Sequence, residues 1–318
     1  TEENGHLRYE GWSGYDSLPV IQTPAGTDAA VSHESELNNR TWAEYILTSD
    51  DAIAKRWIKR GASGWRLDVA PEVDAAFWRE LRTQVKSLTL PNGEAPALLG
   101  ETFQDASQFF LGDQFDSVMN YAFRHAVQKA LLIDGDAAAA AAVLRGLQQS
   151  YPKEAMYSLM NLLGSHDTAR ALYLLGGGED TGVLAEKGKH FDYELGKSRL
   201  KLAATFQMGY PGAPTMYYGD EVGLFGSRDP DCRRPFPWGS EDQDILAHYR
   251  KTAEIRTAHK DLFAHGELLT LYAEGDVYVY ARTSEKQAAM IAINRSSTAK
   301  EVTLNLPETI ASGTFSDQ

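Results

Sequence analysis

The sequence predicts an α/β protein in which a parallel, barrel-type sheet is followed by a small antiparallel β domain. Strand-like and helix-like segments alternate along most of the chain, which is typical of βα units. Three acidic residues, Asp68, Glu101 and Asp167, each end a short apolar, strand-like run. Parallel barrels build their active sites from residues at the carboxyl ends of strands, so the positions of these acids favour a barrel. After Lys260 the helical periodicity disappears, which predicts the second domain.

The elements around the first acidic run follow this alternation. Residues 50–60 carry apolar side chains on one helical face, and Gly61 then provides a helix stop. The apolar run over residues 64–68 is expected to be a strand. A helix packed on the outside of the barrel should follow it, because apolar residues recur there at helical spacing: Phe77, Leu81, Val85 and Leu88.

Further strands and helices alternate through the middle of the chain. Short apolar runs predict strands over residues 97–101, 115–119, 157–165 and 213–218. Periodic segments predict helices over residues 104–111, 122–133, 136–149, 193–208 and 244–258. The alanine-rich stretch 137–142 belongs to one of these helices, because alanine is the strongest helix former.

The C-terminal part contains short β-type runs that are separated by turns and show no helical period. These runs cover residues 268–272, 277–282, 288–294 and 302–306. Runs of this kind are typical of antiparallel sheets. We therefore expect two domains, with part of a barrel in residues 1–260 and an incomplete antiparallel β domain in residues 261–318.

Charge and composition exclude several classes of function. The chain has 318 residues, of which 43% are hydrophobic and 24% charged, as in ordinary globular proteins. Its 31 basic and 44 acidic residues give a net charge of −13, which argues against nucleic acid or an anionic membrane as a partner and suits a neutral sugar. The single cysteine, Cys232, excludes an internal disulfide, and no Cys/His cluster has metal-binding spacing. No apolar run approaches the roughly 18 residues of a membrane-spanning helix.

The first acidic run contains a basic residue placed beside the acid. Alternation along a strand puts Arg66 and Asp68 on the same face. A neighbouring guanidinium favours the ionised form of a carboxylate, which is the form that acts as a nucleophile. One acid at the end of a strand is most often a helix cap or a surface charge. Three such acids in succession, each followed by a helical segment, favour an active site instead.

These runs resemble a known family. Gly-Trp-Arg-Leu-Asp-Val-Ala (64–70), Leu-Gly-Glu (99–101) and Leu-Leu-Gly-Ser-His-Asp (162–167) are similar to three of the four signature regions of the α-amylase family of glycoside hydrolases. Further stretches resemble its neopullulanase and amylopullulanase branch: residues 14–20, 112–121, 209–221 and 229–234. The first signature region, an Asp followed closely by an Asn-His pair, is not found in the sequence.

The resemblance implies the second part of a (β/α)8 TIM-type barrel, from just before strand 4 through strand 8 and its helix. The first three strands are then expected on another polypeptide or in a removed segment. That N-terminal half is the expected protein partner, and activity should require it. The upstream portion could also have carried a secretion signal, so we expect a secreted protein.

The resemblance also implies roles for the residues at the strand ends. Asp68 would be the nucleophile and Glu101 the general acid and then base, as in retaining glycosidases, whose two carboxyl groups stand roughly 5 Å apart. Asp167 would grip sugar hydroxyls as the ring flattens, and His166 would hydrogen-bond the same sugar. Arg66 would contact the substrate region beside Asp68.

Residues outside these runs are expected to extend the sugar-binding surface. In the family, Asp229 and Arg233 would reach sugars farther from the cut, although a loop salt bridge of little energetic value is an equal alternative. Trp12 offers an aromatic face for a glucose ring, and Glu72 is a further expected substrate contact. Phe103 stands where relatives often have Trp.

The implied activity is endo-type hydrolysis of α-1,4 and also α-1,6 glucosidic bonds in starch, pullulan or related maltooligosaccharides. Two alternatives remain open from the sequence. The same chemistry could transfer the glycosyl unit to another sugar instead of water, or the chain could be a non-catalytic structural or transport-associated relative. The reaction should need no cofactor, and a structural Ca2+ ion, where present, is expected mainly in the N-terminal half.

Overall fold

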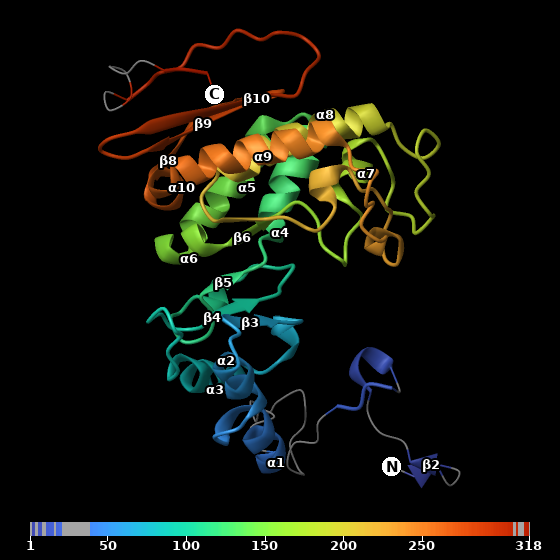
Figure 1. Cartoon of the computed structure of the whole chain (residues 1–318), viewed down its shortest axis with the longest axis vertical. Helices are drawn as coiled ribbons and strands as arrows, with labels where there is room; N and C mark the ends of the chain where they lie inside the picture. Colours follow the sequence, from blue (N-terminus) through green and yellow to red (C-terminus); the bar gives the residue numbers. More distant parts are fainter. Residues whose placement is uncertain are drawn as a thin grey trace. The chain divides into compact units, whose positions relative to one another are not determined.

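A computed structural model describes residues 2–3, 6–7, 11–15, 17–20, 39–307, 310 and 315–317. The chain divides into two compact units, and Figure 1 labels most of their helices and strands. The first unit runs to Glu101 and includes residues 108–116, and the second comprises residues 102–107 and everything from Ser117 onward. Among the described residues, no helix is long and apolar enough to cross a membrane.

The first unit is built around two parallel strands. Strands β3 (Gly64–Leu67) and β4 (Ala97–Gly100) pair in parallel, with Leu67 opposite Gly100. Its other elements are β1 (Glu2–Glu3), β2 (His6–Leu7), α1 (Arg40–Ala43) with a π-helical turn over Glu44–Thr48, α2 (Ile53–Lys59) and α3 (Ala75–Lys86). The strands expected over 64–68 and 97–101 and the helices around them are confirmed.

Helix α3 buries its apolar face inside the first unit. Its buried residues are Phe77, Trp78, Leu81 and Val85. The indole of Trp78 meets the ring of Phe115 edge to face at 5.3 Å and donates a hydrogen bond to the carbonyl of Ala70 (2.9 Å). The strands approach so closely that a Cβ on Gly64 would lie 2.3 Å from the carbonyl oxygen of Ala97. Only glycine fits there.

The second unit continues the alternation of strands and helices. Strands β6 (Met160–Leu162) and β7 (Ala213–Thr215) pair in parallel, and Met119, directly after β5 (Ser117–Val118), forms a parallel bridge with Met160. The long helices are α5 (Ala137–Ser150), α8 (Tyr193–Gly209) and α9 (Gln243–Ala258). Shorter ones are α4 (Tyr121–Arg124), extended by a π-helical segment over His125–Asp134, α6 (Lys153–Ser158), α7 (Ala171–Leu175) and α10 (Lys260–His265).

An antiparallel sheet of three strands follows α10. Its order is β10 (Ala288–Asn294), β9 (Val277–Thr283), β8 (Glu267–Glu274), with β9 in the centre. The sheet packs on α8, because the rings of Tyr278 and Tyr280 lie 5.1 and 4.9 Å from the ring of Phe206. The Tyr280 hydroxyl donates to the carbonyl of Phe206 (2.7 Å). The antiparallel sheet expected from the sequence is confirmed.

Several expected elements are shorter or absent. The helix expected over 104–111 is only a 3₁₀ turn, Ser107–Phe109. Asp105 accepts from the Ser107 N–H as a helix cap does, and Gly112 follows in the left-handed region (φ 93°), so only a short segment lies between these two residues. The strand expected over 157–165 begins only at Met160, since α6 occupies its start. The expected strand 213–218 ends at Thr215. The prediction of a strand over 302–306 was wrong, because the described residues 301–307 form no strand.

Candidate active site

Two of the three predicted acids lie at the same edge of the β3–β4 pair. Asp68 directly follows β3, and Glu101 directly follows β4. The parallel register sets Leu67 opposite Gly100, so the residues that follow these two are brought level. The Glu101 N–H donates to the carbonyl of Leu67 (2.8 Å), which extends the ladder to the acid itself.

A single guanidinium joins the two acids. Arg66 Nη1 donates a hydrogen bond to Asp68 Oδ1, and Arg66 Nη2 lies 2.7 Å from Glu101 Oε1. The Asp68 side chain is 70% exposed, whereas that of Glu101 is 5% exposed. One carboxylate is therefore open to an incoming molecule, while the other is held inside the unit on the same cation.

The turn after Asp68 has an unusual backbone that the sequence did not predict. Val69 has φ 45° and ψ 47°, in the left-handed region, which a β-branched residue strongly disfavours. In this conformation its N–H donates to Glu101 Oε2 (3.1 Å), and the next amide, of Ala70, donates to the Glu101 carbonyl (3.0 Å). Such backbone strain concentrates at functional sites. Both oxygens of the Glu101 carboxylate are thus held, one by Arg66 and one by the strained turn.

Asp167 lies in the second unit, in the loop that follows β6. His166 Nε2 is 3.1 Å from Asp167 Oδ2, and Arg233 Nη2 is 3.7 Å from Asp167 Oδ1. Its backbone N–H donates to Ser165 Oγ (3.2 Å), and that hydroxyl lies 3.1 Å from the Tyr121 hydroxyl. The carboxylate is 35% exposed. It is therefore accessible while its main chain is fixed by side chains behind it.

The predicted pair Asp229 and Arg233 is in direct contact. Arg233 Nε lies 2.6 Å from Asp229 Oδ1, and both side chains are about half exposed. The loop salt bridge expected as one alternative is present. Because Arg233 also faces Asp167, the structure brings three of the predicted residues of this unit, with His166, into one accessible cluster.

An open aromatic face belongs to the same unit. The ring of Phe103 stacks on that of Tyr121 with centroids 3.9 Å apart and an interplanar angle of 23°. Phe103 is 59% exposed, so one face of its ring is open. Tyr121 and Ser165, which support Phe103 and Asp167, were not predicted as site residues, although they lie in the family-like runs 112–121 and 162–167.

The remaining predicted residues lie in the first unit. Trp12 belongs to a 3₁₀ turn, Trp12–Gly14, and is 39% exposed. Glu72 is exposed in the 3₁₀ turn Ala70–Glu72, directly after the strained Val69. Trp12 therefore keeps an accessible ring, and Glu72 keeps an accessible carboxylate.

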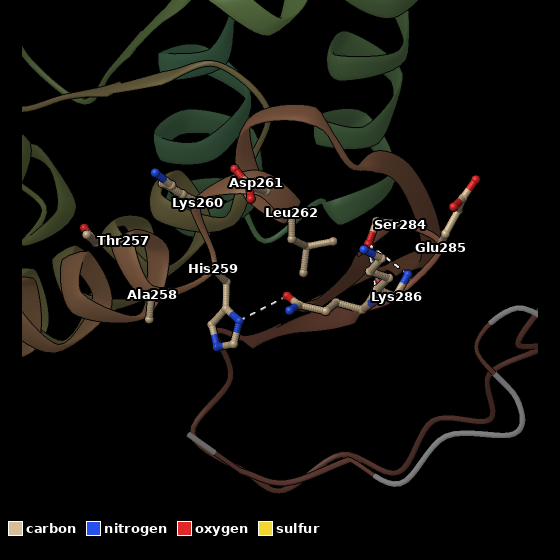
Figure 2. Close-up of a pocket in the computed structure, with 10 residues that line it drawn as sticks. Thr257, Ala258, His259, Lys260, Asp261, Leu262, Ser284, Glu285 and Lys286 are labelled. Carbon is tan, nitrogen blue, oxygen red and sulfur yellow. Dashed lines mark hydrogen bonds between the residues drawn. The ribbon is translucent and has the colours of Figure 1, made fainter.

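The described residues contain no candidate metal site. Among them, no group of three or more His, Cys, Asp or Glu side chains is placed to hold a metal ion. Figure 2 shows a hollow between the α9–α10 junction and the turn from β9 to β10, where His259 Nδ1 lies 3.2 Å from Gln287 Oε1. Its lining contains none of the predicted site residues.

Two family models together match most of the chain. Residues 36–265 match the alpha amylase catalytic domain, and residues 266–312 match the alpha-amylase C-terminal domain. An amylopullulanase of Thermoanaerobacter thermohydrosulfuricus is 41% identical over 96% of this chain and 21% of its own length. Neopullulanase 2 of Thermoactinomyces vulgaris is 35% identical over 95% of this chain and 49% of its own length.

The solved structures agree with these matches. A debranching enzyme from Nostoc punctiforme superposes with a TM-score of 0.74 at 32% identity, covering 94% of this chain and 57% of that chain. A cyclomaltodextrinase superposes with a TM-score of 0.72 at 32% identity, covering 92% of this chain and 44% of that chain. The chain thus spans between about a fifth and somewhat over half of the proteins it resembles.

Proposed function

Because this chain belongs to the alpha-amylase family, and forms part of a TIM-type barrel followed by a three-stranded antiparallel sheet, we propose that it supplies the catalytic carboxylates of a retaining, endo-type glycoside hydrolase. The substrates would be α-1,4 and α-1,6 glucosidic bonds of starch, pullulan or related maltooligosaccharides. The names of its relatives, amylopullulanase and neopullulanase, support this substrate class.

The observation that carries the proposal is the guanidinium shared by Asp68 and Glu101. A retaining glycosidase needs two carboxyl groups only roughly 5 Å apart, one to attack and one to protonate. Two carboxylates bound to the two terminal nitrogens of one arginine are necessarily close together. The exposed member, Asp68, suits the nucleophile, and the enclosed member, Glu101, suits the acid and base.

In the proposed reaction, Asp68 attacks the anomeric carbon while the bond from that carbon to the leaving oxygen breaks. Glu101 gives its proton to the leaving oxygen, and a glycosyl ester with Asp68 forms. Glu101 then takes a proton from water, whose oxygen attacks the anomeric carbon and releases Asp68. In the structure both Glu101 oxygens face donors, Arg66 and the Val69 amide, so before the first step Glu101 must bind a proton and exchange one of these donors for the sugar oxygen. Only carboxyl groups and water take part.

In the second unit, Asp167 would bind hydroxyl groups of the substrate; we call this contact the sugar grip. Asp167 is held by Arg233 and His166 but keeps exposed oxygens, so it can accept hydrogen bonds from sugar hydroxyls. Contacts that strengthen as the ring flattens raise the rate rather than only the affinity. Asp229 and Arg233 would bind sugars farther from the cut, while Phe103 and Trp12 would offer stacking faces and Glu72 a polar contact.

We further propose that activity requires the assembled barrel, meaning this chain together with strands 1 to 3. A closed barrel of this class has eight strands, and the described part of the chain supplies only some of them. Strands 1 to 3 would come from the same polypeptide or from another. All experiments below use the assembled barrel.

The proposal is tested by replacing each acid with its amide. Asp68→Asn removes the nucleophile but keeps its shape, so hydrolysis of a maltooligosaccharide should fall by roughly 10^4-fold or more. Activity within about tenfold of the parent would refute the assignment. Asp113→Asn is the matched control, because Asp113 is an exposed partner of Arg79 in the same unit and its loss should leave turnover unchanged.

Glu101→Gln separates the acid role from a structural one. An activated aryl α-glycoside has a leaving group that departs without protonation, so its hydrolysis should suffer far less than that of a natural glucan. Equal losses on both substrates would remove Glu101 from the acid role.

A further inference from the structure

A fully buried arginine lies three residues after Asp167 and has no part in the reaction proposed above. The Arg170 side chain has no exposed surface. Its Nε donates to the carbonyl of Cys232 (2.8 Å), and its Nη1 donates to the carbonyl of Tyr218 (2.7 Å) and lies 3.2 Å from Asp220 Oδ1. All three partners belong to residues 218–232, the segment that leads into Arg233.

Ring contacts and a backbone bond fix Arg170 further. The centroids of the Tyr217 and Tyr218 rings lie 4.4 and 4.7 Å from its guanidinium carbon. The Arg170 N–H donates to the carbonyl of Gly226 (3.0 Å). A planar guanidinium with this many directional contacts tolerates few positions. Arg170 therefore fixes the segment 218–232 relative to its own segment.

The segment that Arg170 holds is directly connected to Asp167 and Arg233. Cys232, whose carbonyl Arg170 holds, directly precedes Arg233. The buried Cys232 Sγ also donates to the carbonyl of His166 (3.2 Å), the residue directly before Asp167. Arg233 Nη2 in turn lies 3.7 Å from Asp167 Oδ1. The hydrogen bonds from Arg170 to Cys232 and from Cys232 to His166 thus connect the residue before Arg233 with residues before and after Asp167.

We infer that Arg170 is a positioning residue that holds Arg233 and Asp229 against Asp167 and so sets the geometry of the sugar grip. The inference rests on the function proposed above. It predicts that disturbing Arg170 lowers turnover through misplacement of Asp167 and Arg233, even though Arg170 touches no substrate. Misplacement by about 1 Å can cost roughly 100-fold in rate.

The primary test is Arg170→Lys, which keeps the charge but loses the planar fork. We expect kcat on a maltooligosaccharide to fall between about 10- and 100-fold per folded active site, with the concentration of active sites titrated by a reagent that traps the nucleophile. The matched control is Arg282→Lys. Arg282 is also fully buried and donates to the carbonyls of Gly209, Phe263 and Gly266.

The control separates positioning from general stability. Both variants should lower the melting temperature, because both weaken a buried arginine. Only Arg170→Lys should change kcat per active site and KM. Equal kinetics per active site in the two variants would overturn the inference.

A second variant covers the case in which Arg170→Lys does not fold. Removing one partner of a buried ion pair leaves an uncompensated charge, whereas replacing both does not. The double replacement Arg170→Gln/Asp220→Asn retains hydrogen-bonding groups at both positions. It should show the same loss of kcat, and kinetics within twofold of the parent would refute the inference.

A double-mutant cycle tests the route of the effect. If Arg170 acts in part by placing Arg233, then Arg170→Lys should reduce activity by a smaller factor in an Arg233→Ala background than in the parent. Independent effects would multiply and would count against the inference. Failure of the proposed function looks different, since Asp68→Asn would then retain hydrolysis whatever happens at Arg170.

Discussion

Removing the guanidinium between Asp68 and Glu101 should destabilise the first unit far more than removing one of the exposed ion pairs of that unit would. Arg66→Met is the chosen change, because methionine preserves an apolar stem of similar reach. The Arg66 Nη2 to Glu101 Oε1 distance is 2.7 Å and the Glu101 side chain is 5% exposed. Coulomb's law at an effective dielectric constant of about 20 gives an attraction of about 6 kcal/mol at this distance.

The net effect on stability should be about half of that attraction, because desolvation of the pair offsets part of it. We therefore expect Arg66→Met to lower the free energy of unfolding by about 3 kcal/mol. Asp68 should contribute little to this loss, since its side chain is 70% exposed. The assay is urea unfolding followed by tryptophan fluorescence, with Trp65 on β3 and Trp78 on α3 as reporters in this unit.

Two further variants make the reasoning refutable. Arg66→Met/Glu101→Gln should recover most of the lost stability, because a neutral amide needs no cation. Arg79→Met is the control: Arg79 and Asp113 are 50% and 40% exposed, so its loss should cost less than about 1 kcal/mol. If the double variant is as unstable as Arg66→Met, the buried charge is not the cause of the destabilisation.

Two more outcomes follow from the second unit. Burial raises the pKa of Asp220 from 3.8 to about 7, so the folded protein binds a proton that the unfolded chain releases between these values, and this contribution to stability is lost as pH rises through about 7. The melting temperature of the parent should fall from pH 5 to pH 8 relative to that of Asp220→Asn, and parallel curves would contradict this. Phe103→Ala should raise KM for a maltooligosaccharide about fivefold with kcat little changed, because stacking is worth about 1 kcal/mol; Phe103→Trp should restore the parent KM, and an unchanged KM in Phe103→Ala would show that its ring binds no sugar.

Local patterns were sufficient to place Asp68 and Glu101 directly after strands and to predict one of their contacts, whereas Asp167, expected at the end of a strand, lies in the loop beyond β6. The run Gly64–Asp68 is short, apolar and bounded, so its strand could be predicted, and the period of two placed Arg66 beside Asp68. The ion pair between them confirms that placement. The contact from Arg66 to Glu101 could not be predicted, because it depends on the register between two strands more than 30 residues apart in sequence.

Other features contradict local preference and leave no sequence signal. A valine gives no reason to expect a left-handed backbone, yet Val69 adopts one and so directs its amide to Glu101. The segment 104–111 has helical spacing but forms only a 3₁₀ turn. At Val69 a contact with a residue more than 30 positions away accompanies the left-handed backbone, and a reading of neighbouring residues cannot anticipate it.

The contacts between these acids and arginine side chains have a chemical reason. The protein is acidic overall, with a net charge of −13, and a neutral glucan brings no positive charge to an acidic site. Under the function proposed above, carboxylates that lie close to a sugar therefore need compensation from the protein. In the first unit Arg66 compensates Asp68 and Glu101, and in the second Arg233 compensates Asp167 and Asp229. In the proposed reaction Glu101 carries a proton when the glycosidic bond breaks, so Arg66 then compensates Asp68 alone. Arg233 still serves both Asp167 and Asp229, and the residual negative charge of that cluster suits stabilisation of the positive charge that develops on the sugar ring in an oxocarbenium-like transition state.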